Sequence, residues 1–282
     1  MNLYAGTRKF SLRMSYRLAR LRERAAGNLD RPRIVFVHTP KTGGTSINSY
    51  FKEHVGSKRS RLFARYEDHV SQELDEFAAH VRPAKFVTGH MPWAAFERCC
   101  GGNVFGFTIL RDPYDRLRSL YHYMVNIPPG HGRGDELDHM QRMSLPEFLS
   151  SPDKRVRFYT DNYFARQFSG SLDGLAETSV ERLRLVEPAI RNLSSLDLIG
   201  FNDDMDSAFA EVARKAGLPP PPTGRRRNVT ADLIASQEKK VEATRGLNSE
   251  MRRLARPLVE ADLMIYEHFL QRRAGNKLQA AD

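Results

Sequence analysis

The sequence predicts an α/β protein built on a mostly parallel central sheet, with helices on both faces of that sheet. Short apolar runs rich in β-branched residues, such as 34–37, recur along the chain and are typical of strands buried on both faces. These runs alternate with segments of helical spacing, separated by Gly, Pro or Asp turn signals. The chain has 282 residues, of which 40% are apolar, so it is long enough to bury one large core.

The predicted elements follow from these runs in chain order. Four strands are expected, at 34–37, 84–88, 104–110 and 196–200. Helices are expected at 46–54, 113–126, 145–150, 180–193, 203–216 and in a terminal group that includes 263–270. Asp112 is suited to cap the second helix and Pro113 to begin it. Residues 127–143 carry Pro, Gly and charge without periodicity, which predicts a surface insertion.

Composition divides the chain into a basic extension at 1–32, one domain at 33–272 and a C-terminal tail at 273–282. Between Arg8 and Arg24 there are seven basic residues and one acidic residue, with apolar residues at helical spacing. This pattern fits an amphipathic helix lying on an anionic membrane surface. It equally fits a helix that is frayed or partly docked on the domain, and the pattern does not choose between the two.

Targeting features predict a cytoplasmic protein with peripheral membrane contact through the basic extension. Basic residues interrupt each apolar stretch near the N-terminus, unlike a secretory signal. No run approaches the ~20 apolar residues of a membrane-spanning helix. The two cysteines, Cys99 and Cys100, are adjacent, so we expect no disulfide framework and a reducing compartment. Structural zinc is not expected, because ligands at finger-like spacing are missing.

The formal net charge is +10, from 44 Lys and Arg against 34 Asp and Glu. Such a field favours anionic partners, which include nucleotides, acidic glycans, nucleic acid and membrane surfaces. The sign of the charge alone does not choose among them.

A glycine-bearing segment, Pro40–Ser46, lies between the first predicted strand and its helix. Adjacent glycines let the backbone curl closely around a tetrahedral anion, and a helix N-terminus offers that anion unpaired N–H groups and a partial positive charge. Lys41 adds a mobile charge, and Thr45 and Ser46 add hydroxyl donors. The segment therefore predicts a phosphate-binding loop. It is not a Walker A loop, because Lys41 precedes the glycines and no Gly-Lys-Ser/Thr follows.

A second motif runs from Phe107 to Ser119, where a strand ends in Arg-Asp-Pro and a serine follows in the next helix. Arg111 at the end of the strand can bind a phosphate through two N–H groups. Ser119 lies about two turns along the helix and can donate from its inner face. Alone, this pattern also fits a salt bridge beside a polar helix residue.

Together, the two motifs resemble the 5′-phosphosulfate loop and the 3′-phosphate motif of sulfotransferases that use 3′-phosphoadenosine 5′-phosphosulfate (PAPS). The closest likeness is to the branch of Golgi carbohydrate sulfotransferases and their bacterial relatives. Weaker likenesses at 161–170, 198–201, 227–230 and 262–269 extend it over roughly residues 33–270. The resemblance implies a P-loop-type sulfotransferase fold and PAPS as co-substrate, with no metal.

The resemblance also implies roles for individual residues. Lys41 would stabilise the leaving phosphate oxygen, and His90, in a Gly-His pair after the second strand, would take the proton of the acceptor hydroxyl. The residues expected to bind PAPS are Lys41, Thr42, Gly43, Gly44, Thr45, Ser46, Arg111, Ser119, Arg226 and Arg227.

Several of these assignments have alternatives. The group Glu67–His69 is a rival source of the base, and His90 could instead bond structurally to backbone. His38 is expected to be structural. Trp93 and Phe96 could stack on adenine or a sugar, but core packing is the commoner role for isolated aromatic residues.

The sequence therefore predicts an O-sulfotransferase whose acceptor is a hydroxyl on a glycan or glycolipid, with no nucleic-acid partner. A P-loop kinase or NTPase is a rival, weakened by the missing Walker lysine and by the lack of a clear magnesium partner. A non-catalytic polyanion-binding module is another rival, which explains the charge but not the two motifs.

Overall fold

The computed structural model describes residues 33–63, 81, 84–99, 104–126, 139–172, 174–221 and 246–279. Several sequence predictions lie outside these residues: the basic extension, the group Glu67–His69, and the loop that contains Arg226 and Arg227.

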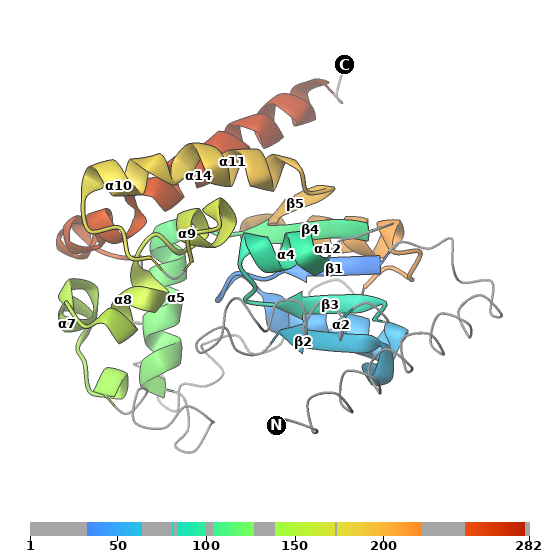
Figure 1. Cartoon of the computed structure of the whole chain (residues 1–282), viewed down its shortest axis with the longest axis horizontal. Coiled ribbons are helices and arrows are strands. Elements are labelled where there is room, and N and C mark those ends of the chain that lie inside the picture. Colours follow the sequence, from blue (N-terminus) through green and yellow to red (C-terminus); the bar gives the residue numbers. More distant parts are fainter. Residues whose placement is uncertain are drawn as a thin grey trace, which may run out of the picture.

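The core of the fold is a five-stranded sheet in which every pair of neighbouring strands is parallel. The strand order is β2-β3-β1-β4-β5, with β1 at the centre (Figure 1). The bounds are β1 Arg33–Val37, β2 Ser60–Phe63, β3 Phe86–Gly89, β4 Val104–Leu110 and β5 Leu198–Phe201. The predicted α/β class is therefore confirmed.

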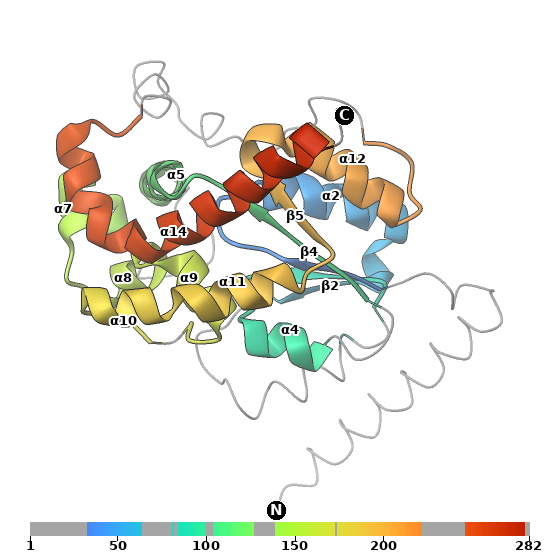
Figure 2. The ribbon, with the colours of Figure 1, turned by 90° about the horizontal axis from the view of Figure 1, so that it is seen from above.

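Helices cover both faces of the sheet (Figure 2). One face is covered by α2 (Gly44–Val55) and α12 (Met205–Lys215), which pack on alternate strand residues such as Phe36 and Phe107. The other face receives Val35 and Val37. Its covering helices are α4 (Trp93–Cys99), α9 (Tyr163–Ser169), α11 (Val186–Ser194) and α14 (Ser249–Gln279).

A third apolar cluster joins helices beyond the carboxyl ends of the strands (Figure 1). It contains α5 (Pro113–Asn126), α7 (Leu145–Ser150), α8 (Lys154–Thr160) and the first half of α14. Helix α5 starts directly after β4, with the Oδ1 of Asp112 accepting the Asp115 N–H at 2.9 Å, as the predicted cap requires. This helical layer places α5 beside the loops that leave the carboxyl edge of the sheet.

Most predicted elements agree with the structure, and the exceptions have physical reasons. The predicted helix at 180–193 is two helices, α10 (Ser179–Arg184) and α11, divided at Leu185. The predicted insertion at 127–143 does not stay on the surface throughout, because Met140 is buried and the Tyr121 hydroxyl donates to the Met143 carbonyl. Helix α14 extends to Gln279 and so includes residues of the expected tail, which was predicted to begin at 273.

No helix among the described residues has the length and apolar content needed to cross a membrane.

Candidate functional site

The segment after β1 forms a tight turn that leads into α2. Lys41 and Gly43 both have left-handed backbone conformations, with φ of 72° and 90°. The Thr42 hydroxyl donates to the Thr39 carbonyl at 2.8 Å, which closes the turn from inside. Helix α2 begins at Gly44, two residues earlier than predicted, so the turn ends at a helix N-terminus.

The two glycines of this turn are required by the protein's own packing. A side chain at Gly43 would place its Cβ 2.2 Å from the Cε of Met205, and the positive φ already favours glycine. A Cβ at Gly44 would lie 2.2 Å from the imidazole of His38. The loop therefore presses closely against α12 on one side and against His38 on the other.

The side chain of Gln167, on α9, fixes the loop through three hydrogen bonds. Its Oε1 accepts the Thr39 hydroxyl at 2.6 Å, and its Nε2 donates to the carbonyls of Met91 at 2.9 Å and His38 at 3.2 Å. Since all of Gln167 is buried, these bonds tie the segments after β1 and β3 to one side chain. Gln167 belongs to the segment 161–170, which resembles a family segment in sequence, but the resemblance did not predict a role for this residue.

The end of β4 meets the same loop. Arg111 follows β4, and its Nη1 donates to the Lys41 carbonyl at 3.0 Å. The Lys41 ammonium lies 4.1 Å from the ring centroid of Tyr123 on α5. Ser119 is on the same helix, one turn before Tyr123, and is buried. The structure thus brings Lys41 and Arg111 together, with α5 beside them.

Two histidines lie at the same edge of the sheet. His90 follows β3 and His38 follows β1, where the His38 N–H donates to the Gly89 carbonyl at 3.0 Å. Their ring centroids are 4.8 Å apart. His38 also stacks on Phe36, at 5.0 Å, and its Nε2 is buried without a hydrogen-bond partner. His38 is therefore packed between the sheet, the loop and His90.

The surroundings of this group lower the pKa of both Lys41 and His38. Burial and the neighbouring charge of Arg111 lower the pKa of Lys41 to about 8. Burial, followed by the charges of His90 and Lys41, lowers the pKa of His38 well below its usual value. Within the described part of the chain, the charged neighbours that shift the pKa of these two side chains are basic residues. We call Lys41, Arg111, His38 and His90 the carboxyl-edge cluster.

A second group of positive side chains is balanced by acids. Arg116 and Arg166, which we call the buried arginine pair, are wholly buried. Arg166 donates to the carbonyls of Asp161, Leu172 and Phe158. Arg116 donates to the carbonyl of Tyr159 at 3.2 Å.

Asp262 of α14 balances this second group. Its Oδ2 lies 3.9 Å from Arg116 Nη2, and its Oδ1 accepts the Ala165 N–H at 2.9 Å. Burial raises the pKa of Asp262 to about 6, although Arg116 acts in the opposite direction. Asn162 adds a further tie to α14 by accepting the Ala261 N–H at 2.8 Å. These residues hold three helices together and are structural.

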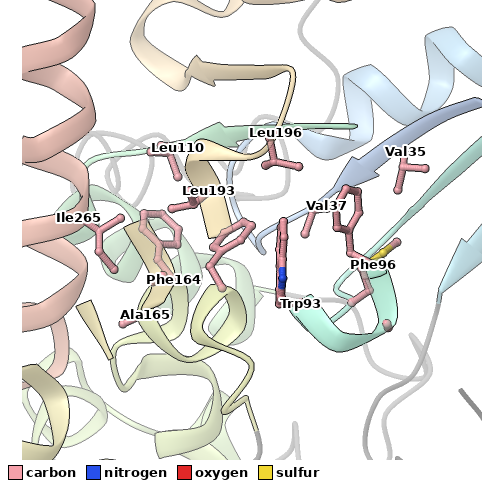
Figure 3. Close-up of a cluster of buried hydrophobic side chains, with 14 of the residues drawn as sticks. Val35, Val37, Trp93, Phe96, Leu110, Phe164, Ala165, Leu193, Leu196 and Ile265 are labelled. Atoms are coloured by element: carbon pink, nitrogen blue, oxygen red, sulfur yellow. The ribbon is translucent and has the colours of Figure 1, made fainter. Parts of the chain in front are cut away.

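Other predicted site residues have varied positions. Thr45 is exposed, whereas Thr42 and Ser46 are buried beside the turn. Trp93 and Phe96 are buried in the same core cluster as Val37 and Leu196, with their ring centroids 4.7 Å apart, so neither is placed to stack on a ligand (Figure 3). Sequence reasoning missed Gln167 and Tyr123. Tyr123 lies four residues after Ser119 on a predicted helix, and this spacing places both on one helix face. The spacing could have identified Tyr123 as a neighbour of the site.

No group of three or more His, Cys, Asp or Glu side chains that could hold a metal ion occurs within the described part of the chain.

These features define a class of protein. An open parallel sheet carries, at its carboxyl edge, a glycine turn, a helix N-terminus and cations that repel one another, which is a site suited to a phosphorylated ligand. The model of the sulfotransferase family matches residues 29–268, and the chain belongs to that family, in the carbohydrate sulfotransferase branch that its motifs resemble. None of the curated proteins matches the chain.

Proposed function

We propose that this sulfotransferase uses PAPS as donor and transfers the sulfuryl group to a hydroxyl, on a glycan or glycolipid. The observation that carries the proposal is the carboxyl-edge cluster, in which the turn at the N-terminus of α2 places Lys41 beside Arg111, whose charge lowers the pKa of Lys41. A ligand with phosphates at both ends of an adenosine would relieve this repulsion. Family membership supports a transferase, and the cluster supports an anionic donor.

The residues fit such a donor at two points. The turn at 41–43 and the first N–H groups of α2 would receive the 5′ end, with Lys41 beside them. Arg111 and Ser119 would receive the 3′-phosphate, Arg111 from the end of β4 and Ser119 from the adjoining helix α5. Arg226 and Arg227 would close over the nucleotide.

The proposed reaction is an in-line displacement at sulfur. The acceptor oxygen forms a bond to sulfur while its proton passes to the imidazole of His90. The bond between sulfur and the 5′-phosphate oxygen breaks, and its electron pair stays on that oxygen. The Lys41 ammonium and the N-terminus of α2 stabilise the charge that develops there. The products are a sulfate ester and adenosine 3′,5′-bisphosphate, and no step requires a metal.

His38 supports this assignment of the base indirectly. Its low pKa leaves it neutral near pH 7, so it adds no charge beside His90. Its Nε2 is buried without a hydrogen-bond partner, so His38 is less accessible to an acceptor than a base would need to be. Glu67 is the rival base in this proposal.

The first experiment measures binding and turnover separately. Calorimetry with adenosine 3′,5′-bisphosphate tests the donor site, and a screen of glycan, glycolipid, phenol and peptide acceptors with labelled PAPS tests transfer. Lys41→Ala should lower turnover on the order of 10²–10³-fold, as the loss of one preorganised donor does. His90→Ala should lower it on the order of 10²-fold or more.

Matched controls are available away from the loop. Lys52→Ala removes an exposed lysine at the other end of α2, and His139→Ala removes a histidine that is half exposed. Both should leave turnover unchanged. Unaltered turnover in Lys41→Ala and His90→Ala would overturn the site, and absence of bisphosphate binding would overturn the donor. Magnesium-dependent ATP turnover would instead establish the kinase or NTPase alternative, and salt-sensitive binding of any polyanion would establish a binding module.

A cytoplasmic location with peripheral membrane contact through residues 1–32 is part of the same proposal. Co-sedimentation with anionic vesicles, with and without these residues, tests it, and equal binding of both forms would contradict it.

A further inference from the structure

The Lys41 side chain has an aromatic neighbour that neither motif contains. Its Nζ lies 4.1 Å from the centroid of the Tyr123 ring, well within the distance at which a ring face attracts a cation. The two residues come from different parts of the fold. Lys41 is in the turn after β1, and Tyr123 is in the third turn of α5.

Among the described neighbours of Lys41, neither Arg111 nor His38 attracts its ammonium. Arg111, from the end of β4, donates to the Lys41 carbonyl, which fixes the main chain, but its charge repels the ammonium. His38, from the end of β1, is neutral near pH 7. Lys41 also has a left-handed φ of 72°, which is uncommon for a residue with a long side chain. The main chain is thus fixed in a constrained turn, and the contact with α5 sets the direction of the side chain.

We propose that Tyr123 is a positioning residue for Lys41. The face of the Tyr123 ring holds the Lys41 ammonium beside Arg111 before the donor binds. The proposal rests on the proposed function, because it takes Lys41 as the group that meets the leaving phosphate oxygen. An ammonium already placed at the edge of the sheet needs little reorganisation when charge develops on that oxygen.

The test varies the ring face and keeps its size. Phenylalanine, then 4-fluoro-, 3,5-difluoro- and 3,4,5-trifluorophenylalanine, is introduced at position 123 of the full chain. Without donor, the rate at which acetic anhydride modifies Lys41 is followed against pH by peptide mass spectrometry. Fluorine weakens the negative ring face, so the pKa of Lys41 should fall stepwise, by about one unit over the series. Tyr123→Phe should titrate like the wild type, near the value of about 8.

Turnover supplies the second readout. Tyr123→Leu should lower kcat about tenfold with a smaller change in the donor KM, and Tyr123→Phe should restore kcat to within about twofold of the wild type. Tyr121→Phe is the matched control. Tyr121 lies on the same helix but packs on Phe148 and donates to the Met143 carbonyl, so it should not move the Lys41 titration.

The outcomes separate the two proposals. A Lys41 titration that is constant through the fluorinated series, or a kcat equally low in Tyr123→Phe and Tyr123→Leu, overturns the role of Tyr123 and leaves sulfuryl transfer standing. A stepwise titration in a protein that binds no adenosine 3′,5′-bisphosphate overturns the proposed function and retains the contact between Lys41 and the ring.

Discussion

Two groups of positive side chains contact or belong to helix α5, and they differ in the groups that surround their charge. In the buried arginine pair, Arg116 faces Asp262 and Arg166 spends its donors on three carbonyls. In the carboxyl-edge cluster, the charged neighbour that lowers the pKa of Lys41 is Arg111, which is another cation. The guanidinium of Arg166 is bonded by the chain itself, although Arg116 Nε and Asp262 Oδ2 are buried without hydrogen-bond partners. The second group, in the function proposed above, is completed by an anion from outside. Charge balance, more than burial, distinguishes a structural cation from a binding one here.

The comparison predicts that the buried arginine pair is required for stability. Arg166→Leu removes the donors of three carbonyls, two buried and one partly buried, and should lower the free energy of unfolding by about 3–5 kcal/mol. Urea denaturation followed by circular dichroism measures this. Arg214→Leu, which removes an exposed ion pair with Glu211, is the control and should leave the midpoint almost unchanged. Equal effects of the two substitutions would contradict the contrast.

Gln167 connects structure to binding, so its loss should affect both. Gln167→Leu leaves the Thr39 hydroxyl and the carbonyls of His38 and Met91 without this partner, which should lower the free energy of unfolding by about 1–3 kcal/mol. Affinity for adenosine 3′,5′-bisphosphate should fall as well, because the turn loses its support. Calorimetry and urea denaturation are compared with those of the exposed Gln271→Leu. A loss of stability with unchanged affinity would show that the hydrogen bonds of Gln167 do not shape the loop.

The pKa of Lys41 predicts how donor binding depends on pH. With a pKa of about 8, Lys41 is an ammonium below pH 8 and a neutral amine above it. Affinity for adenosine 3′,5′-bisphosphate should therefore decrease as pH rises through 8, by about tenfold between pH 7 and 9. Calorimetry at constant ionic strength measures the profile, and Lys41→Met should flatten it. A wild-type profile as flat as that of the variant would remove Lys41 from the anion site.

The smallest expected effect is a substitution that stabilises the protein, whereas most substitutions destabilise it. Burial and Arg111 disfavour charged Lys41, so Lys41→Met should raise the free energy of unfolding at pH 7, by about 1 kcal/mol because partial exposure screens the penalty. The gain should be full below pH 8 and shrink as pH rises from 8 toward 10.5, the unfolded value of the lysine. Urea denaturation at several pH values tests this. A variant that is less stable than the wild type at pH 7 would show that the cluster is balanced after all.

Local signals in the sequence were enough to predict the centre of the fold. Strands β1 and β4 are continuous apolar runs, and α5 begins at Asp112 and Pro113, so each is specified by its own residues. Strand β2 was not predicted, because Ser60–Phe63 is short and partly polar and depends on pairing with β3. Helix α4 was also missed, since its seven residues are too few for a periodic pattern to be recognised.

The candidate site was predictable in part, for the same reason. The two motifs placed Lys41 after the first predicted strand and Arg111 at the end of the third. The structure pairs these strands, β1 and β4, and joins Arg111 to the Lys41 carbonyl by a hydrogen bond. The hydrogen bond between Gln167 and Thr39 was not predictable, because the two residues are 128 residues apart in the chain and the bond depends on how α9 packs. The residues at 161–170 are similar to a family segment, but only the fold shows that Asn162 and Arg166 bond to backbone groups.

Asp262 carries a consequence for how the chain folds during its synthesis. It accepts the N–H of Ala165, 97 residues earlier in the chain, and it is the carboxylate nearest to Arg116. At about 5–20 residues per second, a ribosome needs roughly 5–20 s to make that stretch. During this interval Arg116 has left the ribosome before its acid partner exists. The helical layer therefore has to wait for the last helix, and a nascent chain that stalls before residue 262 should remain open to proteases.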